Sequence, residues 1–356
     1  MQRLITELIP SYLIMKHLPL ARLLRPKTFH EIHGHNYIVD GFKKILFPLK
    51  HHTFLLTGSR GLGKTSLARL IAAALLCPHA ELKHDPCGLC DICDRIQKGQ
   101  HPDLVEIDGA SKTKVEEIRD IISSSMTLPL ESKYKIYLID EVHMLSMHSF
   151  NALLKNLEEP PPHVIFVLAT TEFHKIPGTI RSRCLIFQLQ APPAHELVGY
   201  LKSFCHNRDI PYEDDVLFAI AQQADGSYRD MLNIVEYSLA LTQQRLDDHS
   251  LFNYFSILSH TDIHKIIDQI LESDTVELKN DILKYFDKGL SADKLMKQLM
   301  SWIVEQKDIV QQPLVILYQE LSKCYQLLAT HPYPQSFVLM SLIRISMVAS
   351  LKKKLN

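Results

Sequence analysis

The sequence lacks a long apolar run, an excess of either charge, and any internal repeat or low-complexity tract. No stretch of about 18 or more uninterrupted apolar residues occurs, which argues against a membrane span. The formal net charge of −1 excludes a polycation, so any nucleic-acid site must be a local patch or be completed by partners. Residues 1–26 are mildly apolar, but Glu7 and Pro10 interrupt them and no small-residue cleavage site follows, which disfavours a signal peptide.

Cysteine is rare outside one segment. Four of the seven cysteines occur within residues 77–93, and they are Cys77, Cys87, Cys90 and Cys93. A secreted disulfide scaffold would be shorter and denser in cysteine. Four thiolates can close a tetrahedral Zn²⁺ site, and a C-x2-C pair turns tightly enough to supply two of them. The spacing therefore predicts a structural zinc module over residues 77–93, in which His79 and His84 are spare ligands.

The first half of the chain alternates short apolar runs with amphipathic stretches. We expect strands at residues 53–58, 103–108, 134–140, 163–171 and 184–190, with helices at 64–76, 114–125 and 147–157. Continuous apolar runs separated by helices are typical of a parallel sheet that is covered on both faces, and they predict an α/β domain. After residues 190–195 the composition changes, and amphipathic segments predict a small helical bundle followed by a second all-α region.

The segment “GSRGLGKT” fits the pattern G-x-x-x-x-G-K-[ST] and lies between an expected strand and an expected helix. Backbone N–H groups of such a loop surround phosphate oxygens, and the helix adds its positive N-terminal end. Lys64 would place a charge on the β- and γ-phosphates, and the Thr65 hydroxyl would ligate Mg²⁺. The predicted phosphate-binding loop comprises Gly58, Ser59, Arg60, Gly61, Leu62, Gly63, Lys64, Thr65 and Ser66.

A second motif, “YKIYLIDEVHML”, predicts a strand that ends in two adjacent carboxylates. Asp140 would hold Mg²⁺, and Glu141 would polarise the attacking water as a general base. Arg183 and Arg229 are candidates for a guanidinium on the γ-phosphate, supplied in cis or by a neighbouring subunit. Either arginine taken alone is more often a surface charge, but the order of the whole set favours an ATPase.

The chain closely resembles the ATPase subunits of bacterial clamp loaders, the gamma/tau family of DNA polymerase III. The resemblance rests on the two motifs above and on “RPKTF” (25–29), “PCGLCDIC” (86–93), “ASKTKVEEIRD” (110–120), “HSFNALLKNLEEPP” (148–161), “LATT” (168–171), “SRC” (182–184) and “GSYRD” (226–230). It covers about residues 21–240, and the remainder matches only as a helical pattern. The resemblance implies an N-terminal extension (1–20), a P-loop AAA+ ATPase domain (21–192), a helical lid (193–258) and an oligomerising helical collar (259–356).

The resemblance also implies residue roles. Thr171, or the neighbouring Thr170, would be sensor 1 near the γ-phosphate. Arg183 would be the arginine finger given to the ATP of the adjacent subunit, and Arg229 would be sensor 2, coupling the lid to the nucleotide. The adenine end would be held near Ala21, Arg22, Arg25 and Pro26. The positions that would face DNA are Lys114, Arg119, Lys155 and Lys175, although each lysine taken alone fits a solvated helix face equally well.

The chain departs from the family pattern around the expected adenine pocket. Gly34-His35 stands where the family has Gly-Gln, and Leu23-Leu24 stands where it has Lys-Trp, which weakens the adenine assignment but not the phosphate site. Residues 1–14 precede the usual start and are expected to be an extension or a misplaced start codon. The length is expected to be that of the shorter gamma form, without the helicase- and polymerase-binding domains of tau.

Two classes of function follow. The first is a cytoplasmic motor that hydrolyses ATP with Mg²⁺ and loads a sliding clamp onto primed DNA, together with delta-type and delta-prime-type subunits and copies of itself. No polymerase active site is expected in this chain. The second is a non-hydrolysing scaffold, which has no need of Lys64, Asp140, Glu141 and Arg183 together. An AAA+ branch-migration helicase is the alternative motor, but it has no need of the cysteine module.

Overall fold

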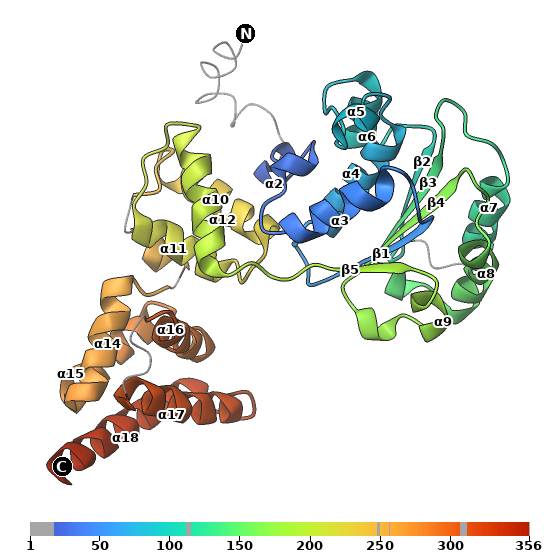
Figure 1. Ribbon diagram of the computed structural model, residues 1–356. Coiled ribbons are helices and arrows are strands. Elements are labelled where there is room, and N and C mark those ends of the chain that lie inside the picture. Colours follow the sequence, from blue (N-terminus) through green and yellow to red (C-terminus); the bar gives the residue numbers. More distant parts are fainter. Residues whose placement is uncertain (1–17, 112–114, 248–249, 256, 307–311, 356) are drawn as a thin grey trace. The chain divides into compact units, whose positions relative to one another are not determined.

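The computed structural model describes residues 18–111, 115–247, 250–255, 257–306 and 312–355, and Figure 1 shows it. The chain divides into two compact units, one containing Met1–Tyr200 with Ala224–Glu236 and the other Leu201–Gln223 with Tyr237–Asn356. Within the described ranges no helix combines the length and the apolar character needed to cross a membrane. The division into an ATPase domain, a lid and a collar remains a prediction.

The first unit is built on a parallel five-stranded sheet with the order β2-β3-β4-β1-β5. Its strands are β1 (Thr53–Thr57), β2 (Leu104–Asp108), β3 (Lys135–Asp140), β4 (Val164–Thr170) and β5 (Leu185–Gln188). Each strand lies inside the range expected from its apolar run. The parallel sheet of the expected α/β class is therefore confirmed.

Helices connect and cover these strands. The longer ones are α3 (Asn36–Leu46), α4 (Lys64–Leu76), α6 (Asp91–Lys98), α7 (Val115–Ser125) and α8 (Met147–Glu158). The short ones are α2 (Leu20–Leu23), η1 (Phe29–Glu31), α5 (Ala80–Lys83), η2 (Val142–Met144), η3 (Phe173–Lys175) and α9 (Gly178–Arg181). The structure confirms the expected helices at 64–76, 114–125 and 147–157, with bounds that agree within one residue.

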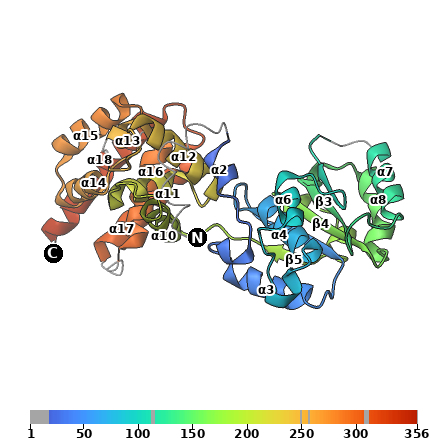
Figure 2. The same cartoon turned by 90° about the horizontal axis from the view of Figure 1, so that it is seen from above.

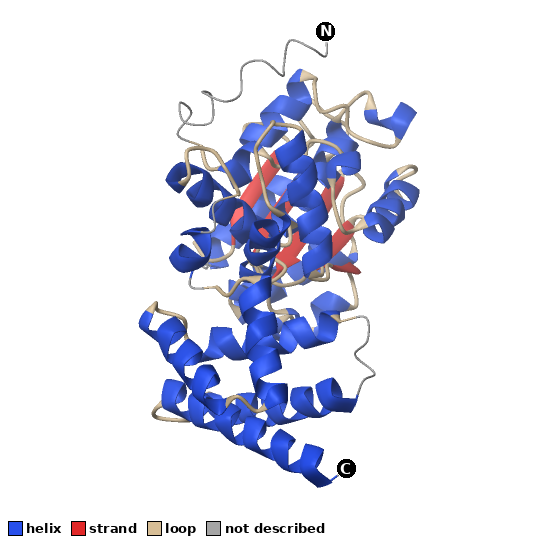
Figure 3. Ribbon diagram, turned by 90° about the vertical axis from the view of Figure 1, so that its left-hand side faces the viewer, coloured by secondary structure: helices blue, strands red, loops and turns tan. Residues whose placement is uncertain are grey.

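Side chains alternate between the two faces of the sheet, and both faces are buried. On β1, Phe54 and Leu56 join a core with α3 and α4, whereas Leu55 joins a second core with α7 and α8. Figure 2 shows α3 and α4 on one side of the strands and α7 and α8 on the other, and Figure 3 shows the strands surrounded by helices. Burial on both faces explains why the strands are continuous apolar runs and not alternating ones.

The second unit is helical. It contains α11 (Asp214–Gln223), α13 (Ser250–Phe255), α14 (His260–Glu272), α15 (Thr275–Asp287), α16 (Ala292–Glu305), α17 (Gln312–Leu328) and α18 (Pro334–Leu355). Two further helices, α10 (Ala194–His206) and α12 (Tyr228–Leu241), each contain one boundary between the units, and a third boundary follows the end of α11. One apolar core joins α14 to α18, and a capping box of Ser259 and Asp262 begins α14. These helices match the amphipathic segments expected from the sequence.

The burial of β1 generates a prediction. Leu55 is fully buried between Leu168 of β4 and Ile186 of β5 in the strand register, whereas Ile186 is 41% exposed. We expect Leu55→Ala to lower the free energy of unfolding of the sheet by about 2–5 kcal/mol because it leaves a cavity. The matched change Ile186→Ala should cost less than about 1 kcal/mol. Native-state hydrogen exchange of the β1 and β4 amides measures both values, and equal losses would contradict the assigned burial.

Candidate nucleotide site and cysteine cluster

The candidate site lies where the carboxyl ends of β1, β3 and β4 meet at one edge of the parallel sheet. The phosphate-binding loop follows β1, Asp140 ends β3 and Thr170 ends β4. Thr65 at the start of α4 donates a hydrogen bond from Oγ1 to Asp140 Oδ2 at 2.5 Å. The two oxygens predicted to ligate Mg²⁺ are thus adjacent, and hydroxyl and carboxylate oxygens are the donors that this cation prefers.

Two glycines shape the loop for different reasons. Gly63 has φ +91° and is the N-cap of α4, and an added Cβ would meet nothing within 4 Å, so its backbone angle alone requires glycine. Gly61 has φ +81°, and an added Cβ would lie 1.9 Å from Ser227 Oγ. The loop therefore presents the first N–H groups of α4, which have no acceptor within the helix, to an anion.

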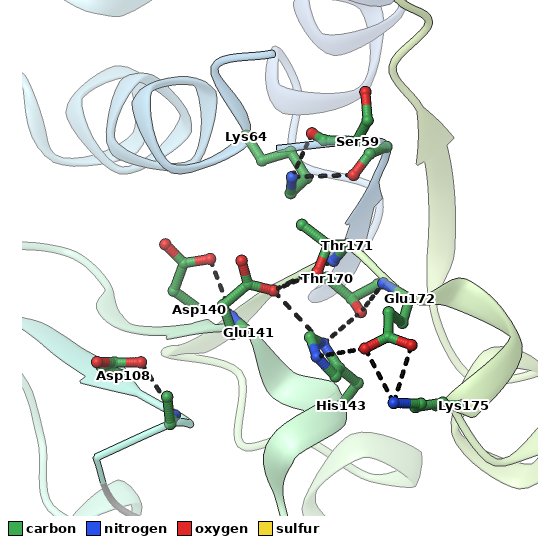
Figure 4. A network of polar contacts seen from close by, with 12 residues as sticks. Ser59, Lys64, Asp108, Asp140, Glu141, His143, Thr170, Thr171, Glu172 and Lys175 are labelled. Carbon is green, nitrogen blue, oxygen red and sulfur yellow. Dashed lines mark hydrogen bonds and ion pairs between the residues drawn. The ribbon is translucent and has the colours of Figure 1, made fainter. Parts of the chain in front are cut away.

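Lys64 is buried beside the acidic pair. Lys64 is only 5% exposed. Its Nζ donates hydrogen bonds to the carbonyl oxygens of Gly58 at 2.9 Å and Ser59 at 2.8 Å (Figure 4). Burial lowers the pKa of Lys64, and the charges of Glu141 and Asp140 oppose that shift. A buried cation in a low-dielectric site attracts a phosphate more strongly than an exposed one.

A pocket of about 640 Å³ opens at this edge, a volume within the usual range for small-molecule sites. The predicted residues that line it are Ala21, Arg22, Arg25, Pro26, Arg60, Gly61, Leu62, Gly63, Lys64, Thr65, Ser66, Asp140, Glu141 and Arg229. Gly58 and Ser59 are not among the lining residues, and their carbonyl groups hold Lys64 instead. The structure thus brings the N-terminal segment, the loop, the acidic pair and Arg229 to one pocket.

One wall of this pocket is aromatic, and no sequence motif indicates it. His33 packs edge-on against Tyr200 with ring centroids 4.8 Å apart, and Tyr200 packs edge-on against Tyr228 at 5.7 Å. Aromatic faces of this kind suit a planar base. Tyr228 belongs to “GSYRD”, the segment that also contains the candidate Arg229, and His33 precedes Gly34-His35, the pair that differs from the family pattern.

Several buried polar atoms in the pocket wall make no hydrogen bond of normal geometry with the described residues. They are Arg25 Nε, both ring nitrogens of His35, and Tyr228 Oη. His35 is only 3% exposed, and burial lowers its pKa, so its ring is neutral at pH 7. Because buried polar groups are almost always paired, these atoms fit a polar ligand. A nucleotide, with its base, ribose and phosphates, suits the whole donor set.

Glu141 is held at the edge of the sheet by Thr171. The backbone N–H and the hydroxyl of Thr171 both donate to Glu141 Oε2, at 3.2 and 2.9 Å. Thr170 does not make this contact; its Oγ1 lies 3.1 Å from His143 Nδ1. Of the two threonines considered for sensor 1, Thr171 therefore contacts the proposed general base.

The four clustered cysteines meet at the opposite end of α4. Their sulfur atoms lie within 4.8 Å of one another, and the pairs Cys77–Cys90 and Cys87–Cys93 are each 3.9 Å apart. A tetrahedral site with Zn–S bonds of about 2.3 Å has edges of roughly 3.8 Å. All seven cysteines of the chain are free, and His84 stacks on Phe47. The arrangement therefore fits one zinc ion held by four thiolates.

Local hydrogen bonds prepare one of these thiols for ionisation. Burial opposes ionisation of Cys87, but the N–H groups of Leu89 and Cys90 outweigh it and lower the pKa of Cys87 to about 6. Burial raises the pKa of Cys77 and of Cys93. A divalent cation would stabilise the thiolate form of all four, which couples metal binding to folding of this small segment.

Comparison with known proteins identifies the family of this chain. It is 41% identical over 285 residues to the DNA polymerase III subunit gamma of Buchnera aphidicola subsp. Acyrthosiphon pisum (strain APS), which covers 80% of this chain and 79% of that protein. It is 37% identical over 287 residues to the DNA polymerase III subunit tau of Escherichia coli (strain K12), covering 80% of this chain and 44% of tau. The chain belongs to the DNA polymerase III gamma/tau family.

Other similarities are more distant. A family model described as “DNA polymerase III, delta subunit” matches residues 40–193. The solved structure of the Thermotoga maritima RuvB Holliday junction branch migration motor is 20% identical and covers 79% of this chain and 91% of that one, with a TM-score of 0.47.

In this gamma/tau chain the two candidate arginines lie in different places. Arg229 lines the pocket, and its backbone N–H lies 3.4 Å from the carbonyl oxygen of Gly61. Arg183 does not line the pocket; it donates to Thr179 O at 2.7 Å and pairs with Glu158 at 3.1 Å. A role for Arg183 in a neighbouring subunit's site is compatible with this placement.

The four residues expected to face DNA are only partly described. Lys155 is exposed on α8, and Lys175 is paired with Glu172 at 2.8 Å. Lys114 and the side chain of Arg119 lie outside the described residues.

The cysteine geometry generates a second prediction. We expect the purified chain to hold one zinc ion and Cys90→Ser to lose it, whereas Cys184→Ser, outside the cluster, should keep it; metal analysis measures both. Chelation should speed hydrogen exchange across residues 77–93 before ATP binding is lost, because the cluster stabilises only its own segment. Loss of ATP binding while this segment stays protected would show that the two sites are not separate.

Proposed function

We propose that this chain is the ATP-hydrolysing motor subunit of a bacterial DNA polymerase III clamp loader, which loads a sliding clamp onto primed DNA. The proposal rests chiefly on the contact of Thr65 with Asp140 beside Lys64, in one pocket of a gamma/tau chain. A non-hydrolysing scaffold could share the fold. Such a scaffold would not need a general base, whereas here Thr171 holds Glu141 at the same edge of the sheet as Lys64. The cysteine cluster and the family disfavour the branch-migration helicase.

Each residue of the site has a role in the proposed reaction. The loop N–H groups and Lys64 bind the β- and γ-phosphates of ATP, and Thr65 and Asp140 hold Mg²⁺. The bound Mg²⁺ neutralises charge on the phosphates. Glu141, held by Thr171, orients the attacking water and accepts its proton. Arg229 acts on the nucleotide of its own pocket, and Arg183 acts on the ATP of an adjacent subunit.

The proposed partners follow from the proposed role as a clamp-loader subunit. Copies of this chain and subunits of the delta and delta-prime types form the cytoplasmic complex through the helical collar at 259–356, and the lid at 193–258 follows the nucleotide. Lys114, Arg119, Lys155 and Lys175 contact phosphates of primed DNA. The net charge of −1 suits this arrangement because several subunits together focus a modest basic patch onto the duplex. The zinc ion is structural.

The test is the ATPase rate of the chain assembled with partner subunits and clamp, with and without primed DNA. We expect DNA to raise the wild-type rate. Lys64→Ala should abolish ATP binding, whereas Glu141→Gln should bind ATP and hydrolyse it at least about 100-fold more slowly. The exposed Glu159 at the end of α8 offers a matched control, and Glu159→Gln should leave the rate unchanged. The motor function would be refuted if DNA and clamp did not change the wild-type ATPase rate and this rate equalled that of Lys64→Ala.

Arg183 provides a separate prediction. If it completes a neighbour's site, Arg183→Ala should lower hydrolysis in the assembly by about 10³-fold and leave the ATP affinity of the isolated chain unchanged. Arg181→Ala is the matched control, since this nearby arginine stacks over Phe173 at 5.0 Å. An unchanged rate in the assembly would show that Arg183 takes no part in hydrolysis and makes only its surface ion pair with Glu158.

A further inference from the structure

The cysteine cluster belongs to a larger structural unit that includes α5 and α6. Cys90 is the N-cap of α6, and its sulfur accepts a hydrogen bond from the backbone N–H of Cys93. Helix α6 ends at Lys98, and both α5 and α6 pack against α4 (Figure 1). We call residues 77–98 the cysteine–helix unit, since the thiols fix the start of its longer helix.

A carboxylate of this unit caps η1, the short helix that connects two stretches of the nucleotide pocket wall. Residues 24–26 line the pocket before η1, and residues 31–33 line it at and after the end of η1. The N-cap of η1 is Thr28, whose side chain makes no capping hydrogen bond. Asp85 supplies one instead, because its Oδ1 accepts the backbone N–H of Phe29 at 2.7 Å. Asp85 is 5% exposed and Phe29 is 1% exposed, so without this carboxylate the N–H would be buried and unpaired.

Two further contacts join the unit to the same segment. Gly88, in the turn between two cysteines, has φ +69°, and an added Cβ would lie 3.3 Å from Thr28 Cγ2 and 3.4 Å from Lys27 Cβ. Gln97, in the last turn of α6, donates from Nε2 to the carbonyl oxygen of Pro26 at 3.3 Å. The unit therefore touches the segment at every position from Pro26 to η1.

The unit can support this segment because it is itself fixed to the sheet. Arg69 of α4 donates from Nη1 to the carbonyl oxygen of Gln97 at 3.4 Å, and its Nη2 lies 2.6 Å from Glu106 Oε2 on β2. The two side chains are 16% and 24% exposed, so this ion pair is largely shielded from water. The end of α6 is thus held at a fixed position relative to α4 and β2.

We propose that the cysteine–helix unit positions the base end of the nucleotide pocket, with Asp85 as its principal positioning residue. The inference rests on the proposed function for the identity of the ligand, ATP. Asp85 does not line the pocket; it acts through the backbone of η1, which leads into Ile32 and His33. His33 belongs to the aromatic wall that suits a planar base, whereas the phosphates bind the loop after β1. A zinc ion would contribute to base binding only indirectly, by keeping the unit folded.

The test compares how the full chain binds ATP and inorganic tripolyphosphate, each with Mg²⁺, by titration calorimetry. Asp85→Ala removes the acceptor of the Phe29 N–H and should weaken ATP binding about fivefold, the factor expected for one hydrogen bond. Tripolyphosphate has no base, so its affinity should not change. Asp85→Asn keeps an oxygen that can accept from Phe29, and it should bind ATP as the wild type does.

Two further variants guard the test against a loss of structure. Asp94 is a carboxylate of the same unit that pairs with Lys98 on the surface at 2.6 Å, so Asp94→Ala is the matched control and should change neither affinity. Metal analysis shows whether each variant keeps its zinc. If Asp85→Ala loses the metal, Gln97→Ala decides, because Gln97 lies beyond the four cysteines. It should weaken ATP binding about two- to threefold, since its hydrogen bond is longer, and leave tripolyphosphate binding unchanged.

The outcomes separate this inference from the proposed function. An ATP affinity that stays at the wild-type value in a zinc-loaded Asp85→Ala, or in Gln97→Ala where Asp85→Ala has lost its zinc, would overturn the inference. A parallel loss of ATP and tripolyphosphate affinity would also overturn it, because the effect would not be confined to the base. A wild type that binds neither ligand would refute the nucleotide site and the inference together. A wild type that binds ATP but shows no DNA-stimulated hydrolysis would refute only the motor, and the two affinities would still decide the role of Asp85.

Discussion

The pairing of β4 between β1 and β3 is the constraint on which the rest of the site depends. Parallel hydrogen bonding sets Thr57 opposite Thr170 and Ile139 opposite Leu168, so three strands end at the same level. The loop after β1, the acidic pair after β3 and the threonines after β4 are therefore neighbours. Any slip in this register would separate Thr65 from Asp140, and the two proposed Mg²⁺ ligands would no longer share a cation.

Helix α4 separates two kinds of chemistry. Its N-cap is Gly63 of the phosphate-binding loop and its C-cap is Cys77 of the cysteine cluster. Thirteen residues at a rise of about 1.5 Å place these ends roughly 20 Å apart. The cysteines therefore lie far from the candidate nucleotide pocket, in a segment whose buried apolar core consists of Cys77, Ala80 and Cys93.

Much of the fold could be predicted because its signals are local. The central strands β1, β3 and β4 are apolar runs bounded by polar residues, and burial on both faces of the sheet makes those runs continuous. The helices of the second unit are visible as amphipathic segments because each places an apolar side against the core that it shares with its neighbours. The strand order could not be read from local patterns, because it depends on which apolar faces pack together over long sequence separations.

The sequence by itself determined the parts of the site whose chemistry is contained in a short motif: the loop from Gly58 to Thr65, the acidic pair and the four cysteines. Only the tertiary structure decided which other groups meet them. It placed Tyr228 beside Tyr200, set the buried ring of His35 in the pocket wall, and connected Glu141 to Lys175 through His143. The reason is physical: hydrogen bonds and ring contacts act over a few ångströms, and folding alone brings distant residues within that range.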